Sequence, residues 1–269
     1  MKTSLPIYQA DAFTKEMFKG NPAAVVPLSA WLPAPLMQQI AMENNLAETA
    51  FYVPNPNDAH SYHLRWFTPA IEVDLCGHAT LAAAFIINHL AGGQIKQLTF
   101  TTQVAGPLTV NMDNGWYYLD FPAWPPQAIA KPDGLAKALR LMPQQILQVL
   151  RTRDLLVVVD NAQTVANLQP DFNALAELDT LGVIVTAAGP QGIDAVSRFF
   201  APKAGINEDP VTGSAHCTLI PYWREQLNKD NLVMQQWSAR GGHLVCKLVG
   251  DRVHIGGQVV LYMQGEIFV

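Results

Sequence analysis

The chain has 269 residues, of which 49% are hydrophobic and only 14% are charged. Because soluble proteins average about 25% charged residues, this composition predicts a folded chain with a large core and excludes a disordered one. The length fits one large domain or two of about 130 residues each. The 17 Lys and Arg against 22 Asp and Glu give a net charge of −5. A chain with this net charge has no net positive potential to attract phosphate groups, which argues against nucleic acid as a partner.

The sequence predicts a cytoplasmic protein that does not enter a membrane. No apolar stretch approaches the roughly 20 residues that cross a bilayer, and the first residues lack the apolar core of a secretory signal. The three cysteines, Cys76, Cys217 and Cys246, are too few for a disulfide framework and are expected as thiols. The low charged fraction is typical either of a self-association surface, most simply that of a homodimer, or of a large core.

The first half opens with a strand, a helix and a second strand. Residues 23–26 and 47–53 fit strands, and residues 35–44 fit a helix between them. This helix has a proline at an early position and apolar residues on one face, and Asn44 and Asn45 are typical of a left-handed stop.

A second helix is expected to begin at Gly77 and to end at Gly92 and Gly93. It is apolar nearly all round, so it belongs inside a fold rather than on its surface. Short strands follow at residues 98–102, 108–111 and 116–120, and the proline-rich residues 122–126 are typical of a linker between halves.

The second half repeats this order. A strand at residues 155–159, a helix at 171–178 and a strand at 183–185 are expected. A further helix follows Gly213, and Pro221 should kink it about two turns in. Two more strands are expected at residues 243–247 and 252–255.

Two segments of the chain echo each other. Residues 65–69 lead through a loop to Gly77, and residues 198–202 lead through a loop to Gly213. The leading arginines are 133 residues apart and the glycines 136, about half the chain length. Each segment fits a strand, a proline turn, a loop and a glycine-led helix, so duplication is the simplest interpretation.

We therefore predict an α+β fold of two pseudo-symmetric halves, each a barrel-like, mostly antiparallel sheet wrapped around a central helix. Residues 1–118 would form the N-terminal half and residues 119–257 the C-terminal half. Residues 258–269 would form a return strand that joins the N-terminal half.

The two glycine-led helix starts are candidate anion sites. The first turn of a helix leaves backbone N–H groups free and carries the positive end of the helix dipole. At Gly77 and Gly213 these groups could bind a carboxylate and the negative charge that develops beside it. Alternatively, both are ordinary helix starts with a small residue for packing.

Glu48 is the candidate acid or base. Period-two alternation places it with Leu46, Ala50 and Tyr52 in an apolar strand. Desolvation there would raise the carboxyl pKa toward the range that a general acid or base needs. The alternative is that Glu48 begins the strand at the surface. The second half offers no matching acid at residues 180–182.

Several motifs together closely resemble those of the PhzF-like family, the phenazine-biosynthesis isomerases, which are related in fold to diaminopimelate epimerase. The match runs in order along nearly the whole chain, with family-like spacing. The motifs are GNPAAVV at residues 20–26, AETAF at 47–51, RWFTP at 65–69, CGHAT at 76–80 and EDPVTGSAH at 208–216.

The resemblance implies an active site in the cleft between two pseudo-symmetric halves and chemistry without metal, flavin, nicotinamide or pyridoxal. By motif, Glu48 matches the catalytic general acid/base. Gly77 and Gly213 match donors of backbone N–H groups to a substrate carboxylate. Three further residues would line the site and assist the movement of the proton, namely His78, Asp209 and Ser214. Asn21 matches a cleft position.

One departure bears on mechanism. Diaminopimelate epimerase and its close relatives use two opposed cysteines, one before each central helix. Cys76 matches the first position, but Thr212 stands at the second and Cys217 lies about one turn beyond it. A two-thiol racemase is therefore disfavoured, and Cys76 is expected as a buried residue or a cleft wall.

The resulting hypothesis is a cofactor-independent isomerase or epimerase that moves a proton beside the carboxylate of a small metabolite. One alternative is a non-catalytic small-molecule-binding protein on the same fold. Another is a metal-dependent hydrolase built on Cys76, His78, His216 and Cys217, although the adjacent His216 and Cys217 face different sides of a helix. Arg65 and Arg198 could select the substrate or form ordinary ion pairs.

Overall fold

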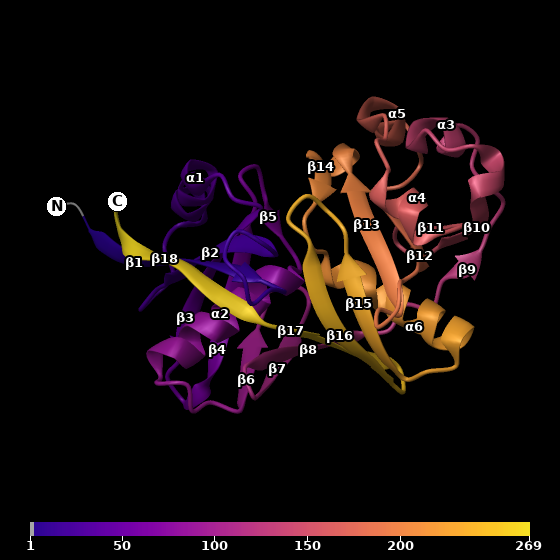
Figure 1. The fold of residues 1–269 in the computed structure, drawn as a ribbon. Helices are drawn as coiled ribbons and strands as arrows, with labels where there is room; N and C mark the ends of the chain where they lie inside the picture. The colour runs from indigo at the N-terminus through magenta and orange to yellow at the C-terminus, as the bar shows by residue number, and fades with distance from the viewer. Residues whose placement is uncertain (1–2) are drawn as a thin grey trace. The chain divides into compact units, whose positions relative to one another are not determined.

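The computed structural model describes residues 3–269, whose contacts divide the chain into two compact units. The first unit runs to Asp120 and takes up residues 256–269 again at the end, and the second comprises Phe121–Ile255. In Figure 1 the first unit is coloured indigo to magenta, with a yellow last strand. Within residues 3–269, no helix has the length and apolar character needed to span a membrane.

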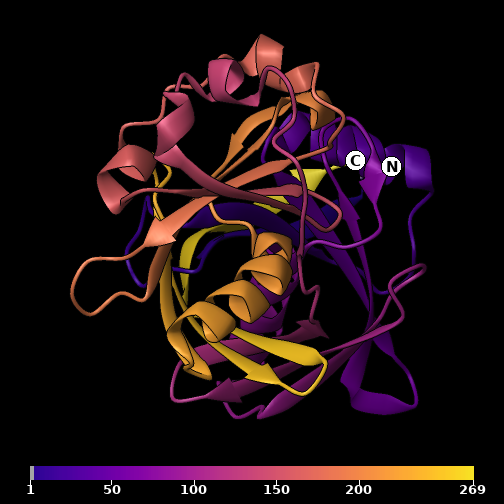
Figure 2. The ribbon, with the colours of Figure 1, turned by 90° about the vertical axis from the view of Figure 1, so that its right-hand side faces the viewer.

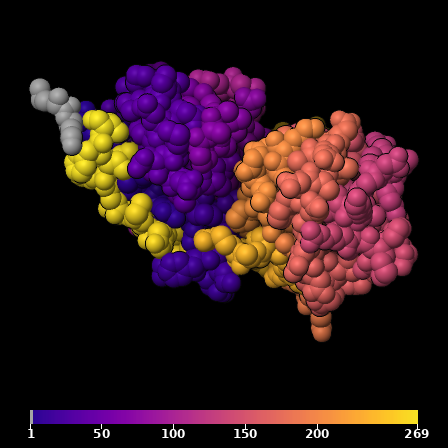
Figure 3. All heavy atoms as spheres, turned by 90° about the horizontal axis from the view of Figure 1, so that it is seen from above, coloured from indigo at the N-terminus to yellow at the C-terminus, as the bar shows by residue number. Residues whose placement is uncertain are grey.

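The first unit is built on a mostly antiparallel sheet. Strand β1 pairs with the C-terminal strand β18 and with β2, and β2 runs parallel to β3. Strand β4 then pairs antiparallel with β3 and β5 and parallel with β6, and β7 and β8 continue antiparallel. In Figure 3 the yellow β18 lies against indigo residues of this unit. The strands are β1 Ser4–Ala12, β2 Asn21–Pro27, β3 Glu48–Asn55, β4 Asp58–Phe67, β5 Glu72–Val73, β6 Gln97–Thr101, β7 Pro107–Asp113, β8 Trp116–Pro122 and β18 Val259–Phe268.

Two helices complete the first unit. Helix α1, Ala34–Asn44, begins at a proline and stops at Asn45, which has a φ of 49°, as the sequence predicted. Helix α2, Gly77–Leu90, is buried along almost its whole length and packs on β1, β2, β3 and β18. Gly257 allows this enclosure, because a Cβ there would lie 3.0 Å from Leu81 of α2. The prediction of a sheet around a central apolar helix is confirmed here.

The second unit has the same plan with more short elements. Its strands are β9 Gln127–Ala128, β10 Ile146–Arg151, β11 Leu155–Val159, β12 Val183–Ala188, β13 Ala195–Ala201, β14 Ile206–Asp209, β15 Asn231–Gln236, β16 Gly242–Val249 and β17 Arg252–Gly257. Its helices are α3 Leu135–Leu139, α4 Ala162–Ala166, α5 Phe172–Ala176 and α6 Gly213–Leu227, with 3₁₀ turns η1 Pro143–Gln145 and η2 Pro202–Ala204. The central helix, α6, packs against β15 and β16 (Figure 2).

Helix α6 continues through Pro221. Proline lacks the N–H that would bond the carbonyl oxygen four residues earlier, that of Cys217. The main-chain N–H of Trp124 donates to this oxygen instead, at 2.8 Å. The neighbouring N–H of Ala123 donates to the carbonyl of Asp251. The proline-rich residues 122–126, expected as a linker, are therefore tied into the second unit.

Strand pairing establishes the duplication. The parallel pairs β2–β3 and β4–β6 of the first unit recur as β11–β12 and β13–β15 in the second. Arg65 stands opposite Phe51, as Arg198 stands opposite Val185, so the position equivalent to Glu48 is Gly182. The longer glycine spacing arises in the β13–β14 hairpin, which contains η2: its paired residues Phe199 and Asp209 are ten positions apart, against seven for Trp66 and Val73 in the β4–β5 hairpin.

Gly182 explains why the second unit has no acid at this position. A Cβ there would lie 2.5 Å from the Phe199 ring and 2.9 Å from Oδ1 of Asp154. Both distances are far below van der Waals contact. The Phe199 ring and the Asp154 carboxylate therefore leave no room for a side chain at position 182.

We expect Gly182→Ala to lower the free energy of unfolding by about 1 to 3 kcal/mol, the usual cost of overpacking a core. Gly265→Ala is the matched control, because no atom lies within 4 Å of a Cβ at that position. Denaturant unfolding of both variants measures the difference. Equal stability of Gly182→Ala and the wild type would mean that Phe199 moves aside freely.

Candidate active site

The imidazole of His78 is the centre of a buried polar cluster in the first unit. His78 is the second residue of α2. Its Nε2 lies 3.1 Å from Oε2 of Glu48, and its Nδ1 lies 3.1 Å from Nδ2 of Asn21 and 3.5 Å from Sγ of Cys76. The side chains of Glu48 and His78 are 13% and 5% exposed. The structure thus brings together three of the predicted site residues, and adds Cys76.

Each of these side chains is placed by the end of an element. Glu48 is the first residue of β3 and precedes its buried stretch. Asn21 begins β2 and follows Gly20, whose φ is 65°. A Cβ at Gly20 would lie 2.2 Å from the carbonyl oxygen of Ala12, so only glycine permits this turn. The glycine of the GNP motif therefore sets where the Asn21 amide enters the core.

Glu48 and His78 are close without completing a hydrogen bond to each other. Their separation is that of an ion pair, yet neither Oε2 nor Nε2 has a hydrogen-bond partner among residues 3–269. Buried polar atoms are nearly always hydrogen-bonded in folded proteins. Oε2 and Nε2 therefore face each other as an ion pair and make no other polar contact among residues 3–269.

The surroundings of His78 decide its charge. Burial alone would lower its pKa, but the interactions with Cys76 and Glu48 outweigh burial and place the pKa well above the ordinary value. Burial, with a smaller contribution from Glu48, raises the pKa of the Cys76 thiol to about 11. At neutral pH the cluster therefore holds an imidazolium and a neutral thiol.

Glu48, Cys76 and His78 also have the composition of a metal site, and one potential ligand atom of each lies within 4.8 Å of the others. Their arrangement does not favour chelation. Glu48 faces Nε2 of the ring and Cys76 faces Nδ1, and the lone pairs of these two nitrogens diverge. One ion cannot use both nitrogens, so the carboxylate and the thiol approach the ring at different atoms.

The hydrolase alternative also loses its second pair of ligands. The Nδ1–H of His216 donates to the carbonyl of Thr212 at 2.8 Å. Cys217 is buried, which raises its thiol pKa to about 12. Among residues 3–269, the cluster with metal-ligand spacing consists of Glu48, Cys76 and His78, and neither His216 nor Cys217 belongs to it.

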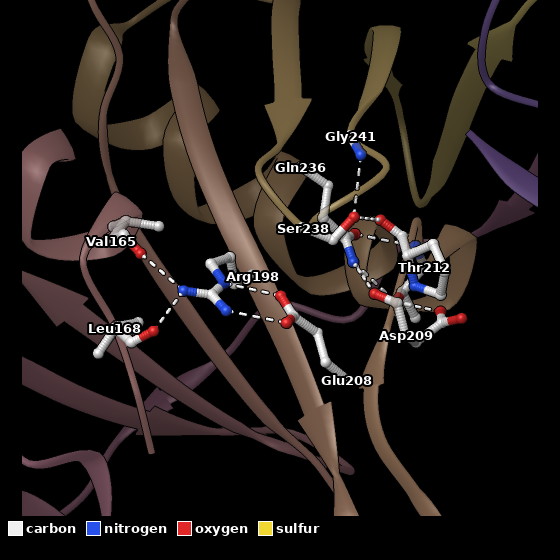
Figure 4. A network of polar contacts seen from close by, with 10 residues as sticks. Val165, Leu168, Arg198, Glu208, Asp209, Thr212, Gln236, Ser238 and Gly241 are labelled. Atoms are coloured by element: carbon white, nitrogen blue, oxygen red, sulfur yellow. Dashed lines mark hydrogen bonds and ion pairs between the residues drawn. The ribbon is translucent and has the colours of Figure 1, made fainter. Parts of the chain in front are cut away.

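The second unit places Asp209, Gly213 and Ser214 around the start of α6. The hydroxyl of Thr212 donates to Oδ2 of Asp209, and the N–H of Thr212 donates to Oε1 of Gln236 at 2.8 Å (Figure 4). Nε2 of Gln236 donates to the carbonyl of Asp209 at 2.7 Å. This network fixes the turn before the helix. Thr212, at the position equivalent to Cys76, is fully engaged in it.

Gly213 is the buried first residue of α6. Ser214, at the position equivalent to His78, accepts a hydrogen bond from the Arg153 guanidinium at 3.3 Å. The predicted residues therefore fall into two groups, each gathered at the N-terminus of the central helix of its own unit.

Arg65 and Arg198 form ion pairs within their hairpins. Nε and Nη2 of Arg65 contact the two carboxylate oxygens of Glu72 at 2.6 and 2.7 Å. Arg198 contacts Glu208 in the same bidentate way at 2.7 and 2.8 Å (Figure 4). Each guanidinium also lies over the aromatic ring two residues along the strand. Of the two interpretations of these arginines, the structure supports the ion pair.

Sequence reasoning missed Gln236 and the contact of Cys76 with His78. Gln236 was detectable, because Leu232 and Met234 alternate with it on the buried face of β15. A polar residue that ends such a series needs buried partners. The Cys76 contact depends on side-chain direction at a helix start, which spacing does not determine.

A family model described as phenazine biosynthesis-like protein, PhzC-PhzF, matches residues 10–265. The chain belongs to this family. A curated relative named an uncharacterized isomerase, from Pseudomonas aeruginosa, is 50% identical over 263 residues, with 98% of both chains covered. Similarly named isomerases confirm the enzyme class predicted from the sequence.

Solved structures agree on the fold of this phenazine biosynthesis-like protein. A PhzF family protein of Enterococcus faecalis is 49% identical, with a TM-score of 0.94 over 99% of this chain and 100% of that one. A hydroxyproline epimerase of Agrobacterium vitis reaches a TM-score of 0.61 at 9% identity, covering 100% and 94% of the two chains. This second likeness shows the fold alone and confirms the predicted epimerase-like architecture.

His216 leads to a prediction about acid stability. Burial lowers its pKa from 6.5 to about 4, so between these values the unfolded chain binds the proton and the folded one does not. The free energy of unfolding should therefore fall as pH drops through this window, by about 3 kcal/mol in total. His216→Thr, which copies Thr80 of the first unit, should remove that contribution.

Denaturant unfolding of the wild type and of His216→Thr at pH 7 and at pH 4 to 5 measures this contribution. The quantity compared between the two proteins is the change in the free energy of unfolding from one pH to the other. Any constant loss of stability from the substitution cancels in this comparison. Parallel pH profiles for the two proteins would show that His216 is protonated in the folded state.

Proposed function

We propose that this isomerase moves a proton at a carbon beside the carboxylate of a small metabolite, with Glu48 as the general acid/base and no cofactor. The observation that supports it best is the close, nearly buried pair of Glu48 and His78, in which neither Oε2 nor Nε2 has a hydrogen-bond partner among the described residues. A substrate that enters would meet a carboxylate base and an adjacent positive charge.

The proposed step conserves charge at the site. The Glu48 carboxylate takes the proton from carbon, and the electron pair of the broken C–H bond moves toward the substrate carboxylate. The negative charge leaves Glu48 and appears on an enolate-like intermediate, while the His78 imidazolium beside them stays positive. Such fixed charge in a poorly hydrated site stabilises the intermediate. Protonated Glu48 then returns the proton to a carbon of the same framework.

The differences between the two units support transfer on one face of the substrate. An inverting racemase needs two opposed acid/base groups. The second unit has Gly182 at the position of Glu48, where the Phe199 ring leaves no room for a side chain. Its Thr212 hydroxyl, at the position of Cys76, donates to Asp209 and accepts from Gln236. Neither position offers a free second base, which favours a proton shift by one group.

Asn21, Gly77, Asp209, Gly213 and Ser214 remain predicted contacts of the substrate, as the resemblance to the family implies. Backbone N–H groups at the first turns of α2 and α6 would bind its carboxylate, and Asp209 would assist the proton. The metal-dependent alternative has less support, because Glu48 and Cys76 approach different nitrogens of the imidazole.

Glu48→Gln should lower proton exchange by at least about 10²-fold, the usual contribution of a general base, while folding is retained. The measurement is proton NMR of amino, hydroxy and unsaturated acids in deuterated water with chelator present. Glu43→Gln, an exposed carboxylate at the end of α1, is the matched control and should leave exchange unchanged.

A fully active Glu48→Gln variant would refute the assignment. If the wild type bound carboxylates without exchanging any proton, the non-catalytic binding protein would be favoured. Exchange lost to chelator and restored by zinc would favour the metal-dependent hydrolase class instead.

A further inference from the structure

The thiol of Cys76 lies against the one nitrogen of His78 that does not face Glu48. Cys76 is the residue before α2, where serine, threonine, aspartate or asparagine would ordinarily cap the helix. It makes no side-chain cap. Its backbone is instead held by Thr80, whose hydroxyl donates to the Cys76 carbonyl at 2.6 Å. The side chain is thereby left to contact the imidazole.

The two neighbours of Nδ1 differ in what they can do. The amide nitrogen of Asn21, at 3.1 Å, can only donate, so it suits Nδ1 of the neutral ring, whereas the imidazolium needs an acceptor at Nδ1. A thiol can donate through S–H or accept through sulfur. Cys76 is therefore the neighbour able to serve Nδ1 both when the ring is neutral and when it is charged, with rotation of S–H alone.

We propose that Cys76 is the positioning residue of His78, whose neutral thiol holds Nδ1 and thereby keeps Nε2 directed at Glu48 in both charge states of the ring. When the ring is neutral, S–H donates to Nδ1 and the single ring proton sits on Nε2. When the ring is charged, Nδ1–H donates to sulfur. No bond to sulfur is made or broken in the reaction, and the thiol transfers no proton to the substrate.

This role differs from that of a catalytic thiolate. Burial raises the pKa of Cys76 to about 11, so the thiolate is scarce at neutral pH, and the thiolate is the reactive form of cysteine. The importance of Cys76 for turnover rests on the function proposed for Glu48, but its effect on the His78 ring does not.

The test compares Cys76→Ala, which removes both donor and acceptor, with Cys76→Ser, which keeps both. Cys246→Ala is the matched control, because it removes another fully buried thiol, one that lies in the second unit. Long-range ¹H–¹⁵N NMR of the histidine rings, with His78→Gln for assignment, reports the tautomer and pKa of His78 without any substrate. The groups that face this ring are Glu48 from β3, Cys76 from the start of α2 and the uncharged Asn21 from β2.

We expect Cys76→Ala to mix the tautomers of His78 and to change its pKa, because Nδ1 loses the neighbour that bonds it in both charge states of the ring. Cys76→Ser should restore the wild-type spectrum, and Cys246→Ala should leave it unchanged. For an acid that the wild type exchanges, Cys76→Ala should lower kcat by about tenfold or more, as loss of a supporting partner commonly does. KM should change little, and the pH profile should shift with the His78 pKa.

A wild-type His78 tautomer and pKa in Cys76→Ala would overturn the proposal, and so would a Cys76→Ser spectrum like that of Cys76→Ala. If Cys76→Ala fails to fold, the comparison of Cys76→Ser with the wild type still distinguishes the positioning role from a thiolate role. A thiolate role would abolish turnover in the serine variant. A spectrum that changes as expected while Glu48→Gln stays active would uphold the role of Cys76 and refute that of Glu48.

Discussion

The first unit depends on enclosing one apolar helix within its own sheet. Helix α2 is buried on nearly every side, so its first turn is buried too, and no polar side chain in that turn can rely on water. His78 must therefore find its partners inside the protein, and it finds them at the starts of β2 and β3 and at the residue before the helix. The packing that stabilises the unit also assembles its polar cluster.

The second unit shows the same plan with the polar cluster used differently. Both hairpins before the central helices are clamped by a bidentate arginine–glutamate pair, so the scaffold is shared. The positions that differ are those in the cluster. Gly182 replaces Glu48, Thr212 replaces Cys76 and Ser214 replaces His78. The two units thus share the scaffold, whereas the acid and the imidazole of this cluster occur in the first unit.

Most of the architecture was predictable because it rests on repetition and periodicity, which the sequence displays directly. The echoed Arg-to-Gly segments predicted the duplication, and the apolar run after Gly77 predicted an enclosed helix. Short elements such as α3 and α4, each of five residues, span too few turns to show a period. The roles of Arg65 and Arg198 stayed open because their carboxylate partners lie seven and ten residues away across a hairpin. The Cys76–His78 contact stayed hidden because it depends on side-chain direction.

Two buried histidines near the starts of the central helices have pKa values shifted in opposite directions, and the cause lies in their partners. His216 donates Nδ1–H to a neutral carbonyl, nothing among residues 3–269 bonds its Nε2, and burial keeps it uncharged. At His78 the interactions with Cys76 and with the Glu48 carboxylate outweigh burial and raise the pKa. A buried ion pair often gives no more stability than an apolar pair of similar volume. The second unit packs without an ion pair at this position, so the fold does not require the pair of Glu48 and His78, which agrees with the proton chemistry proposed for Glu48.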